Sequence, residues 1–577
     1  MLSKYAAAAL LATSVNGKPL LAADGKLVAR QGPGSYYPVT GATGGVFPRL
    51  EIRDLEQTGE MWNLFLLALT DFEAMDQTII DSYYQIAGIH GMPWYPWDGV
   101  DVAVRPEMGY CPHNQLLFST WHRPYLMLFE QKLQSIAKNI ANQFPSGVKA
   151  KYQEAANKLR IPTWDWAKAV GLEEPVYPTA ISNVQVQVTF PNGTAATIDN
   201  PLYNYDFHPL DNREFNGTGC PEGAGIPSVC QGSPQTIRPS TEELNTNFRN
   251  ILESQRSSLF TVLTQGQNFN SISSTQGCGS QRFGNIEAVH GPVHTLHFPG
   301  HMSPAGAAAF DPVFWLHHAT VDRQVAIWQA LNTDSYVSEC FAFTPTWTIN
   351  MLDDLDENSA LTPFHKNAAG DFLTSADVRN IENLGYTYPD LINTSEEQLR
   401  ANINTLYGGP DDGEEESQSR SAPKTTSSYT KYLAEIQLPL YALDDGNGGS
   451  LAYNVLVFLG DVSSDAKSWA ASDSLVGTAT TLGGVKMKNE QIAPYLVDLT
   501  SALNRAIKNG KTTSEKALDY LKENVSYRLE IGGKGIEKEK VKALSVELVS
   551  TKVQPATSTT EFEKWSAEFE KHGSISG

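Results

Sequence analysis

Basic residues are scarce in this sequence. It has 43 Lys and Arg against 64 Asp and Glu, which gives a formal net charge of −21 over 577 residues. A nucleic-acid backbone or an anionic membrane surface needs a basic binding face, so the sequence argues against both kinds of partner. Long apolar runs are scarce too, and the alanine-rich run from Tyr5 to about Val15 is too short to span a bilayer. Small neutral or aromatic substrates remain open.

Cysteine is also rare, and the complete set is Cys111, Cys220, Cys230, Cys278 and Cys340. Because five is an odd number, at least one cysteine does something other than pair within the chain. Cys111 lies in the segment GYCPHN, two residues before a histidine. A disulfide, a metal ligand and a further role are therefore all open for this thiol.

The N-terminal segment and four glycosylation sequons indicate export. Lys4 precedes the apolar run, as in a signal peptide, which we predict over residues 1–20. A lead-in rich in Gly and Pro follows over 21–48. Four Asn-X-Ser/Thr sequons fit a secreted glycoprotein, at Asn192, Asn216, Asn393 and Asn524. An intracellular latent form remains open as well.

Helical patterns begin after the lead-in. Apolar residues recur at three- and four-residue spacing in 59–75 and 115–144, which predicts a helix in each segment. Asp311 and Pro312 are an N-cap residue and a first-turn proline ahead of VFWLHHATVDRQVAIWQAL, and they predict a third helix. We therefore predict a mainly helical domain over 49–408, with long loops.

The composition changes at Gly408. Residues 409–429 are acidic and almost free of apolar side chains, which predicts a flexible, protease-sensitive linker with Arg420 as a candidate cleavage point. Beyond it, AEIQLPLYAL, AYNVLVFLG and SYRLEIGG alternate apolar and polar residues, as half-buried strands do. We predict a mostly β domain over 430–552 and a tail over 553–577.

The twelve histidines are unevenly distributed. His290 and His294, in HGPVH, are four residues apart, so on a helix they share one face and can bind the same metal ion. Glycine follows the first of them, whereas the zinc-protease motif needs glutamate there. A third ligand is available from the adjacent His317 and His318, in the helix that begins near Asp311.

A second group of histidines lies earlier in the chain. His122 falls in a helical pattern, His113 in the loop before it, and His90 at the end of another helical segment. Two sites with three imidazoles each favour copper or zinc, because imidazole is a common donor to both metals. A pair of copper ions that acts on dioxygen is the simplest interpretation.

Four segments of the chain resemble one known family. GYCPHNQLLFSTWHRPYLMLFEQ, PTWDWA, IEAVHGPVH and AAFDPVFWLHHATVDRQVAIWQ are similar, in this order, to the copper-binding regions of fungal tyrosinases. These are type 3 copper proteins, as are catechol oxidases and molluscan haemocyanins. The resemblance covers about residues 48–408. It implies an antiparallel four-helix bundle that holds two copper ions and uses dioxygen, followed by a β-sandwich-like C-terminal domain.

The resemblance carries ligand roles to individual residues. The copper A ligands would be His90, His113 and His122, and the copper B ligands would be His290, His294 and His318. His317 is the alternative for the last position. Phe314, one helical turn before His318, would pack against the copper B imidazoles. His297 and His301 receive no ligand role.

The resemblance also implies the reaction. Catechols would be oxidised to o-quinones while dioxygen is reduced to water, and melanin-type pigment synthesis would be the family role. Glu287 matches a glutamate that holds a water near the coppers and could accept the proton of a phenol. Gly291 departs from the asparagine of many monophenol hydroxylases, which puts efficient hydroxylation in doubt. The small Ala305, with Thr295 at the same mouth, would leave the pocket open, so monophenol hydroxylation stays an open question.

The cysteines gain a third interpretation from the family. Cys111 would form a thioether with the imidazole ring of His113, which would restrain a ligand held on a loop. A free buried thiol is the alternative. The four other cysteines would form two disulfides, and the simplest of three pairings is Cys220 with Cys230 and Cys278 with Cys340.

Distant parts of the chain would also meet. Arg53 and Tyr407 would tie the start of the catalytic domain to its end. The C-terminal domain would cover the copper site and keep the enzyme latent until the linker is cut. Tyr453 and Phe458 are candidates for a side chain that enters the pocket, although core packing accounts for both.

The alternative function is a haemocyanin-type oxygen carrier. Such carriers are strings of repeated units, whereas this chain has one unit followed by a cleavable linker, which favours an enzyme acting on small phenols. The physiological phenol and the oligomeric state are not determined by the sequence.

Overall fold

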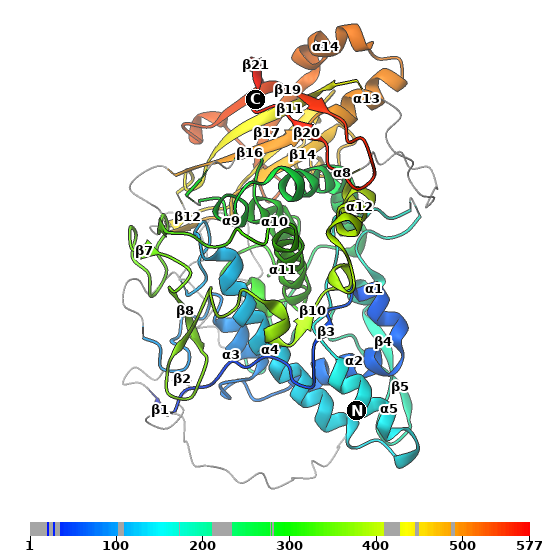
Figure 1. Cartoon of the computed structure of the whole chain (residues 1–577), viewed down its shortest axis with the longest axis vertical. Coiled ribbons are helices and arrows are strands. Elements are labelled where there is room, and N and C mark those ends of the chain that lie inside the picture. The colour runs from blue at the N-terminus through cyan, green and yellow to red at the C-terminus, as the bar shows by residue number, and fades with distance from the viewer. Residues whose placement is uncertain are drawn as a thin grey trace.

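The computed structural model describes residues 35–101, 109–171, 173–210, 233–276, 278–279, 282–408, 427–444, 449–485 and 491–577, together with strands β1 and β2. Most of the predicted signal peptide and of the predicted linker lie outside the described residues, as do Arg420, Cys220 and Cys230. In Figure 1 the C-terminal sheets lie above the helical part along the long axis of the molecule.

The helices are α1 (Ile52–Leu55), α2 (Glu60–Glu73), α3 (Tyr83–Gly88), α4 (Phe118–Ala141), α5 (Ser146–Lys158), α6 (Thr179–Ser182), α8 (Thr241–Gln265), α9 (Phe269–Ser273), α10 (Ile286–Thr295), α11 (Val313–Leu331), α12 (Glu396–Tyr407), α13 (Thr500–Lys508) and α14 (Ala517–Asn524). The short strands of the helical part and its lead-in are β1 (Leu20–Leu21), β2 (Leu27–Val28), β3 (Phe47–Pro48), β4 (Gln185–Thr189), β5 (Ala195–Asp199), β6 (Cys340–Phe341), β7 (Asp354–Leu355), β8 (Ala360–His365), β9 (Phe372–Thr374) and β10 (Tyr386–Thr387). The C-terminal strands are β11 (Tyr429–Pro439), β12 (Gly449–Ser450), β13 (Asn454–Leu459), β14 (Leu475–Thr480), β15 (Gly484–Val485), β16 (Ile492–Asp498), β17 (Val525–Ile531), β18 (Lys534–Ile536), β19 (Ser545–Gln554), β20 (Lys564–Trp565) and β21 (Glu570–Ser574).

The helical part is built around packed helices from distant segments. α4 packs against α2 and α11, while α10 packs against α11 and α8. The apolar spacing in 59–75 and 115–144 correctly predicted α2 and α4. α11 begins at Val313 with Pro312 as its N-cap residue, one position later than predicted, and the Val313 N–H donates to Asp311 Oδ1 at 3.0 Å. The mainly helical class is confirmed.

One predicted contact between the ends of the helical part is wrong. Arg53 bonds to the Glu51 carboxylate at 2.6 Å and to the Val176 carbonyl at 2.9 Å, and 25% of its side chain is exposed. The Tyr407 hydroxyl instead donates to Asp165 at 2.6 Å and accepts from Arg323 at 2.8 Å. The tyrosine therefore ties α12 to α11. The arginine that joins the start of the helical domain to its later segments is Arg49, not Arg53.

Arg49 joins the two ends. Its side chain is fully buried, with Nε 3.0 Å from Glu130 and Nη1 3.2 Å from Asp322. The guanidinium stacks 3.6 Å from the ring centroid of Tyr386, and Nη1 donates to the Tyr388 hydroxyl at 3.2 Å. The guanidinium of Arg49 thus fixes the start of the helical domain to α4, to α11 and to the β10 segment.

We expect Arg49→Ala to lower the free energy of unfolding by about 3–5 kcal/mol, because it removes the nearest cation of buried Glu130 and leaves buried Asp322 with Arg123 as its remaining cation. Arg53→Ala is the matched control, with an expected loss of about 0–1 kcal/mol for a partly exposed pair. Urea denaturation followed by tryptophan fluorescence measures both. Equal losses for the two variants would contradict the assignment.

Two large antiparallel sheets form the body of the C-terminal domain, beside the short β12–β15 pair and helices α13 and α14. One has the strand order β16-β11-β19-β20, with β21 also paired to β19, and the other has the order β14-β13-β17-β18. Side chains from both sheets share one apolar core, among them Ile436, Val455, Leu529 and Val546. Alternating buried and exposed residues along β11 and β16 place this core on one face of the sheet. The predicted β-rich domain is confirmed.

The segment predicted as a tail is part of this domain. β19 continues to Gln554, β20 and β21 pair with it, and the Ile575 N–H donates to the Val546 carbonyl at 2.8 Å. Before β20 the chain leaves the sheet and contacts α12 and α8, where Asn404 and Gln265 donate to its backbone carbonyls. We call residues 559–567 the strap. Residues 553–577 are mostly polar and show no strand pattern, so the sequence did not predict this pairing.

The C-terminal domain rests on α8 and α10 through β14 and β16. Two glycines allow this approach, since a β-carbon at Gly477 would overlap the side chain of Ser254 and one at Gly532 would overlap the ring of Phe298. Figure 1 shows α8 and α10 directly beneath the sheets. The face of the helical part that carries α10 is therefore covered.

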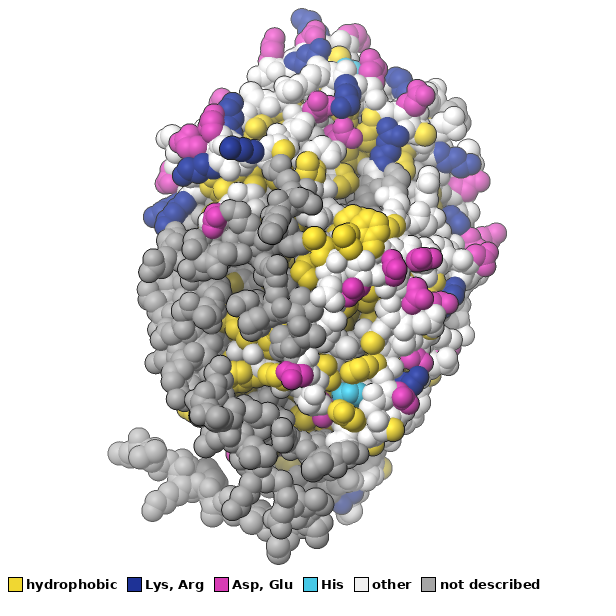
Figure 2. All heavy atoms as spheres, turned by 90° about the vertical axis from the view of Figure 1, so that its left-hand side faces the viewer, with side chains coloured by type: hydrophobic (Ala, Val, Ile, Leu, Met, Phe, Trp, Pro, Cys, Tyr) yellow, Lys and Arg dark blue, Asp and Glu magenta, His cyan; other side chains and the backbone are white. Residues whose placement is uncertain are grey.

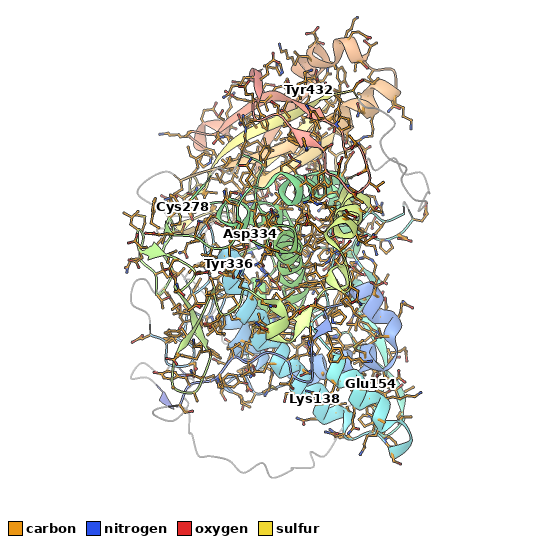
Figure 3. All side chains as sticks on the ribbon, in the orientation of Figure 1. Lys138, Glu154, Cys278, Asp334, Tyr336 and Tyr432 are labelled. Carbon is orange, nitrogen blue, oxygen red and sulfur yellow. A yellow bond between two sulfur atoms is a disulfide. The ribbon has the colours of Figure 1, made fainter. Side chains whose placement is uncertain are left out.

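Figure 2 shows the side of the molecule that carries β7 in Figure 1. Charged side chains of both signs are interspersed over its upper part, and hydrophobic side chains gather near the middle. Phe341, Met351 and Leu352, in and beside the β6–β7 hairpin, are exposed. Cys278, labelled in Figure 3, forms a disulfide with Cys340 at the start of that hairpin.

In the described parts of the chain, we find no helix with the length and apolarity needed to cross a membrane.

Candidate metal centre

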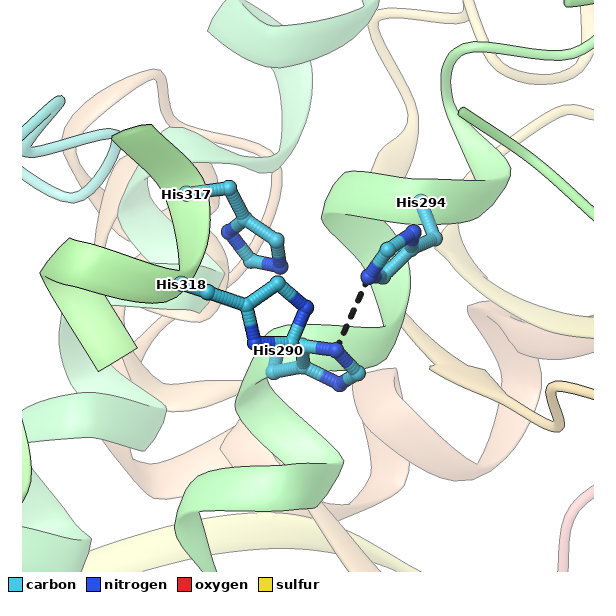
Figure 4. A group of neighbouring side chains, drawn as sticks. All are labelled: His290, His294, His317 and His318. Carbon is cyan, nitrogen blue, oxygen red and sulfur yellow. Dashed lines mark hydrogen bonds between the residues drawn. The ribbon is translucent and has the colours of Figure 1, made fainter. Parts of the chain in front are cut away.

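Two helices bring four histidines together. α10 carries His290 and His294, and α11 carries His317 and His318, as Figure 4 shows. One ring nitrogen from each of the four lies within 4.8 Å of the others. The Nε2 atoms of His290 and His294 are 2.9 Å apart, so the four-residue spacing does place both rings on one helical face.

The earlier histidines meet this group. His90 lies two residues beyond α3, His113 lies in the loop before α4, and His122 lies on α4. The ring centroids of His90 and His113 are 5.0 Å apart, and the ring of His122 stacks on that of His318 at 4.1 Å. The two groups predicted from sequence therefore adjoin each other and share one buried space.

Main-chain carbonyls orient several of these rings. In three histidines Nδ1 lies 2.8 Å from a backbone oxygen. These pairs are His90 with Ala305, His122 with Phe118, and His294 with Met302. A neutral ring that donates from Nδ1 keeps its lone pair on Nε2, which is the arrangement of a metal-binding histidine.

The histidines are neutral in this environment. Burial, the largest cause, lowers the pKa of His113, His122 and His294 to about 3. It also lowers the pKa of His90, His290, His317 and His318 well below the usual value. A metal ion would therefore meet free lone pairs rather than compete with protons at neutral pH.

Trp166 distinguishes His318 from His317 as the third ligand on α10 and α11. The indole Nε1–H donates to Nδ1 of His317 at 3.1 Å, and an indole nitrogen can only donate. Nδ1 of His317 must then accept, so its neutral ring carries the proton on Nε2 and offers no lone pair there. Within the described residues both nitrogens of His318, but only Nε2 of His317, lack a hydrogen-bond partner.

The residues present fit a metal. Nε2 of His90 and of His318 are buried and have no hydrogen-bond partner in the described chain, and such buried nitrogens ordinarily require one. An ion between the rings would satisfy them. Because the inward donors are imidazoles without a neighbouring carboxylate ligand, copper or zinc suits the site.

Cys111 lies beside His113 and His122. Its sulfur is a free buried thiol, 3.6 Å from Nε2 of His113 and 3.5 Å from Nε2 of His122. Burial raises the pKa of this thiol well above its usual value. Its place beside the His113 ring is compatible with a thioether. Of the two disulfides expected, Cys278–Cys340 is present, and Cys220 and Cys230 lie outside the described residues.

Glu287 is buried beside both histidine groups. Its Oε1 accepts from the Asn114 N–H at 2.7 Å, and Oε2 accepts from the Thr275 N–H at 2.9 Å. Burial raises the pKa of this carboxyl to about 7, although the three donors from Asn114 and Thr275 oppose the shift. The carboxylate therefore connects α10 to the residue that follows His113. Sequence reasoning missed Asn114 and Thr275, because neither belongs to a periodic pattern.

The predicted pocket residues have different surroundings. The ring of Phe314 lies 4.2 Å from that of His318 and 4.9 Å from that of His90, so it packs between the groups. Ala305 contributes its carbonyl to His90, as described above. Thr295 is buried, and its hydroxyl bonds back to the Pro292 carbonyl of its own helix at 3.4 Å.

Gly291 faces the C-terminal domain. A β-carbon at this position would lie 3.5 Å from Cγ2 of Thr480, at the end of β14. His297 and His301 are buried but lie outside the histidine groups: His297 Nδ1 contacts the Val293 carbonyl, and His301 accepts from a backbone N–H. We assign them packing and hydrogen-bonding roles.

The candidates for a side chain that enters the pocket lie inside the C-terminal domain. The Tyr453 hydroxyl donates to the Pro439 carbonyl at 2.5 Å, and Phe458 is fully buried in β13. Tyr441 instead reaches the helical part, where its hydroxyl lies 3.1 Å from Nδ2 of Asn114. It lies two residues after β11 within AEIQLPLYAL, where the strand pattern predicts burial but gives no sign of a partner in the helical part.

The fold and the site define a class: a helical protein with two adjoining histidine groups that can hold a metal pair, covered by a β domain. The family model for the common central domain of tyrosinase matches residues 80–331, and the model for the tyrosinase C-terminal domain matches residues 431–548. The chain belongs to the tyrosinase family.

Individual relatives agree with this assignment. A tyrosinase from Podospora anserina is 36% identical over 399 residues, which cover 64% of this chain and 68% of that protein. A solved structure of recombinant mushroom tyrosinase is 25% identical, with a TM-score of 0.79 over 94% of this chain and 99% of that one. A structure of latent and active mushroom tyrosinase has a TM-score of 0.78 at 24% identity, over 94% of this chain and 99% of that one, and shows the fold.

Proposed function

We propose that this chain is a copper oxidase that uses dioxygen to convert o-diphenols to o-quinones, with o-hydroxylation of monophenols as a second, weaker reaction. The observation that carries the proposal is the pair of adjoining groups of buried, neutral histidines, three of them held by carbonyls at Nδ1. We assign copper A to His90, His113 and His122. We assign copper B to His290, His294 and His318.

The chain's own residues prepare this site for phenols. When bound, the two copper ions supply the electron-transfer chemistry that couples oxidation of a phenol to reduction of dioxygen. The carbonyls at Nδ1 hold the histidine rings, and the Phe314 ring fills the space between His90 and His318, which excludes water. The Glu287 carboxylate, fixed by Asn114 and Thr275, is the acceptor for a phenolic proton.

We also propose the thioether between Cys111 and His113. The short distance between the sulfur and the His113 ring supports it. Forming the sulfur–carbon bond removes the thiol hydrogen and one ring hydrogen, a two-electron oxidation for which dioxygen is the oxidant. The bond would hold His113, which lies on a loop rather than a helix, in its ligand orientation.

Latency is the second part of the proposal. The C-terminal domain covers α10 with Thr480 over Gly291, and it contacts the His113 loop through Tyr441. These contacts close the side of the site from which a phenol would approach Glu287. The disulfide Cys278–Cys340 supports the further proposal that the protein is exported, since such bonds persist in oxidising compartments.

Copper analysis and quinone formation test the function. We expect two copper ions per chain and formation of o-quinone from 4-methylcatechol. Zinc or a single metal ion would contradict the proposal. Reversible oxygen binding without any oxidation of a catechol would favour an oxygen carrier, although the relatives reported above are tyrosinases.

Gly291→Asn is expected to raise catechol oxidation by the uncut protein about tenfold. A β-carbon at this position is already in contact with Thr480, and the asparagine side chain extends beyond it, so β14 must move away from α10. A loss of about 1.4 kcal/mol in the free energy that holds the C-terminal domain closed corresponds to a tenfold higher rate. Gly291→Ala is the control, because its β-carbon fits at ordinary contact distance. Initial rates with 4-methylcatechol measure both. Identical rates for asparagine and alanine would show that this contact does not hold the cover closed.

A further inference from the structure

A phenol side chain is bound at the edge of the metal centre. Tyr441 is buried, 7% exposed, and belongs to the apolar core of the C-terminal domain. Its hydroxyl lies 3.1 Å from Asn114 Nδ2 and 3.1 Å from Thr344 Oγ1, both in the helical part. The Asn114 amide N–H donates to the Tyr441 hydroxyl oxygen, and the Tyr441 hydroxyl donates to Thr344 Oγ1, whose own hydrogen is donated to the Asn114 backbone carbonyl. The covering domain therefore presents a phenol to two polar groups of the catalytic part.

These two groups are built into the site. The backbone N–H of Asn114 donates to Glu287 Oε1, and its backbone carbonyl accepts from Thr344 Oγ1 at 3.2 Å. The side-chain Oδ1 of Asn114 accepts from Thr275 Oγ1. Its φ of 52° is the left-handed conformation that asparagine tolerates better than most residues. The side-chain amide is thus fixed before any ligand arrives, and it follows directly after His113.

The supports of this amide are themselves braced. Thr275 and Thr344 come from segments that the disulfide Cys278–Cys340 joins. The disulfide lies three residues after the first threonine and four residues before the second. Both threonines are buried. Preorganised polar groups of this kind are typical of a binding site rather than of a general packing contact.

We propose that Asn114 and Thr344 form a docking subsite for the hydroxyl of a para-substituted phenol or catechol. In the covered protein Tyr441 occupies this subsite, and its side chain is itself a para-substituted phenol. When the C-terminal domain withdraws, a substrate hydroxyl takes the same two partners, next to the carboxylate of Glu287. This inference rests on the proposed function, because the ligand class is that of the proposed substrate.

Binding without oxidation tests the subsite in the full chain. In copper-loaded Tyr441→Ala protein under nitrogen, calorimetry with 4-methylphenol, which reproduces the lost side chain, is compared with toluene, which lacks the hydroxyl. We expect 4-methylphenol to bind about tenfold more tightly, the value of one or two neutral hydrogen bonds. Adding Asn114→Gly keeps the left-handed backbone and the bond to Glu287, and we expect it to remove this preference.

A second readout uses the reaction. With 4-methylcatechol in air, Asn114→Gly or Thr344→Val in the Tyr441→Ala background is expected to raise KM about tenfold with little change in kcat. Tyr441→Phe keeps the ring packing and supports the same KM comparison, so a folding defect of the alanine variant does not end the test.

The outcomes separate this inference from the proposed function. Equal binding of 4-methylphenol and toluene, or a preference that survives Asn114→Gly, overturns the subsite. Oxidation with unchanged KM in both variants also overturns it and leaves the oxidase intact. A complete lack of catechol oxidation refutes the proposed function, while the binding measurement still decides whether the subsite exists.

Discussion

His318→Gln is expected to reduce catechol oxidation at least about 100-fold and to lower the copper content to one ion per chain. Replacing even a residue outside the coordination sphere lowers metal affinity or activity by about 10- to 100-fold, and a direct ligand should matter more. His317→Gln, one residue away, is expected to retain both copper ions and most of the rate. Its glutamine oxygen still accepts the hydrogen bond from Trp166, which is the role that the structure gives to His317.

The pair of variants is informative because the residues are adjacent on α11 and equally buried. Loss of folding or packing would affect both alike, whereas the direction of the Trp166 hydrogen bond affects only His317. Metal analysis and initial rates on the same preparations give the comparison. Loss of copper from His317→Gln with retention by His318→Gln would reverse the assignment of the copper B ligand.

Cutting the linker alone is expected to leave the C-terminal domain bound and the catechol rate within about twofold of the uncut protein. The strap holds the two parts together without the linker: Asn404 Nδ2 donates to the carbonyls of Thr559 and Glu561 at 2.8 Å each, and Gln265 Nε2 donates to that of Glu563 at 2.9 Å. Phe562 packs against Phe260 and beneath the guanidinium of Arg400.

Weakening the strap should therefore release the cover. In protein cut at an engineered site within 409–426, Asn404→Ala with Phe562→Ala is expected to free the domain and raise the rate about 100-fold, which corresponds to about 2.8 kcal/mol of closure. Size-exclusion chromatography and oxygen uptake follow release and activity. Asn402→Ala, on the same helix, is the control, because the Asn402 side chain accepts from Gln398 Nε2 of its own helix at 3.0 Å. Immediate dissociation of the parent after the cut would contradict the role of the strap.

Histidine spacing and the family resemblance predicted most of the candidate site. The four-residue interval placed His290 and His294 on one helical face, because helical periodicity fixes their faces, while the grouping with the next helix and with the earlier histidines came from the family resemblance. The choice between His317 and His318 could not come from spacing. It depends on Trp166, which lies 151 residues away in the chain and meets His317 only in the folded protein.

The misplaced contacts have the same cause. Arg53 and Arg49 are four residues apart, and only tertiary packing decides that Arg49 is fully buried against Glu130 while Arg53 stays partly exposed beside Glu51. The strap follows no period, and the strand pattern around Tyr441 predicts burial but not its partner, because both positions depend on contacts with other segments. Local patterns predict elements and faces, whereas long-range hydrogen bonds select the residues that act.

Oxygen consumption with 4-methylcatechol, before and after the C-terminal domain is separated from copper-loaded protein, tests the central claim most directly. The account predicts slow consumption by the covered protein and a rise of about 100-fold once the domain is removed, with quinone as the product. A separated catalytic part that binds two copper ions but consumes no oxygen with any catechol would contradict it. Equal rates before and after separation would contradict the claim that the domain covers the site.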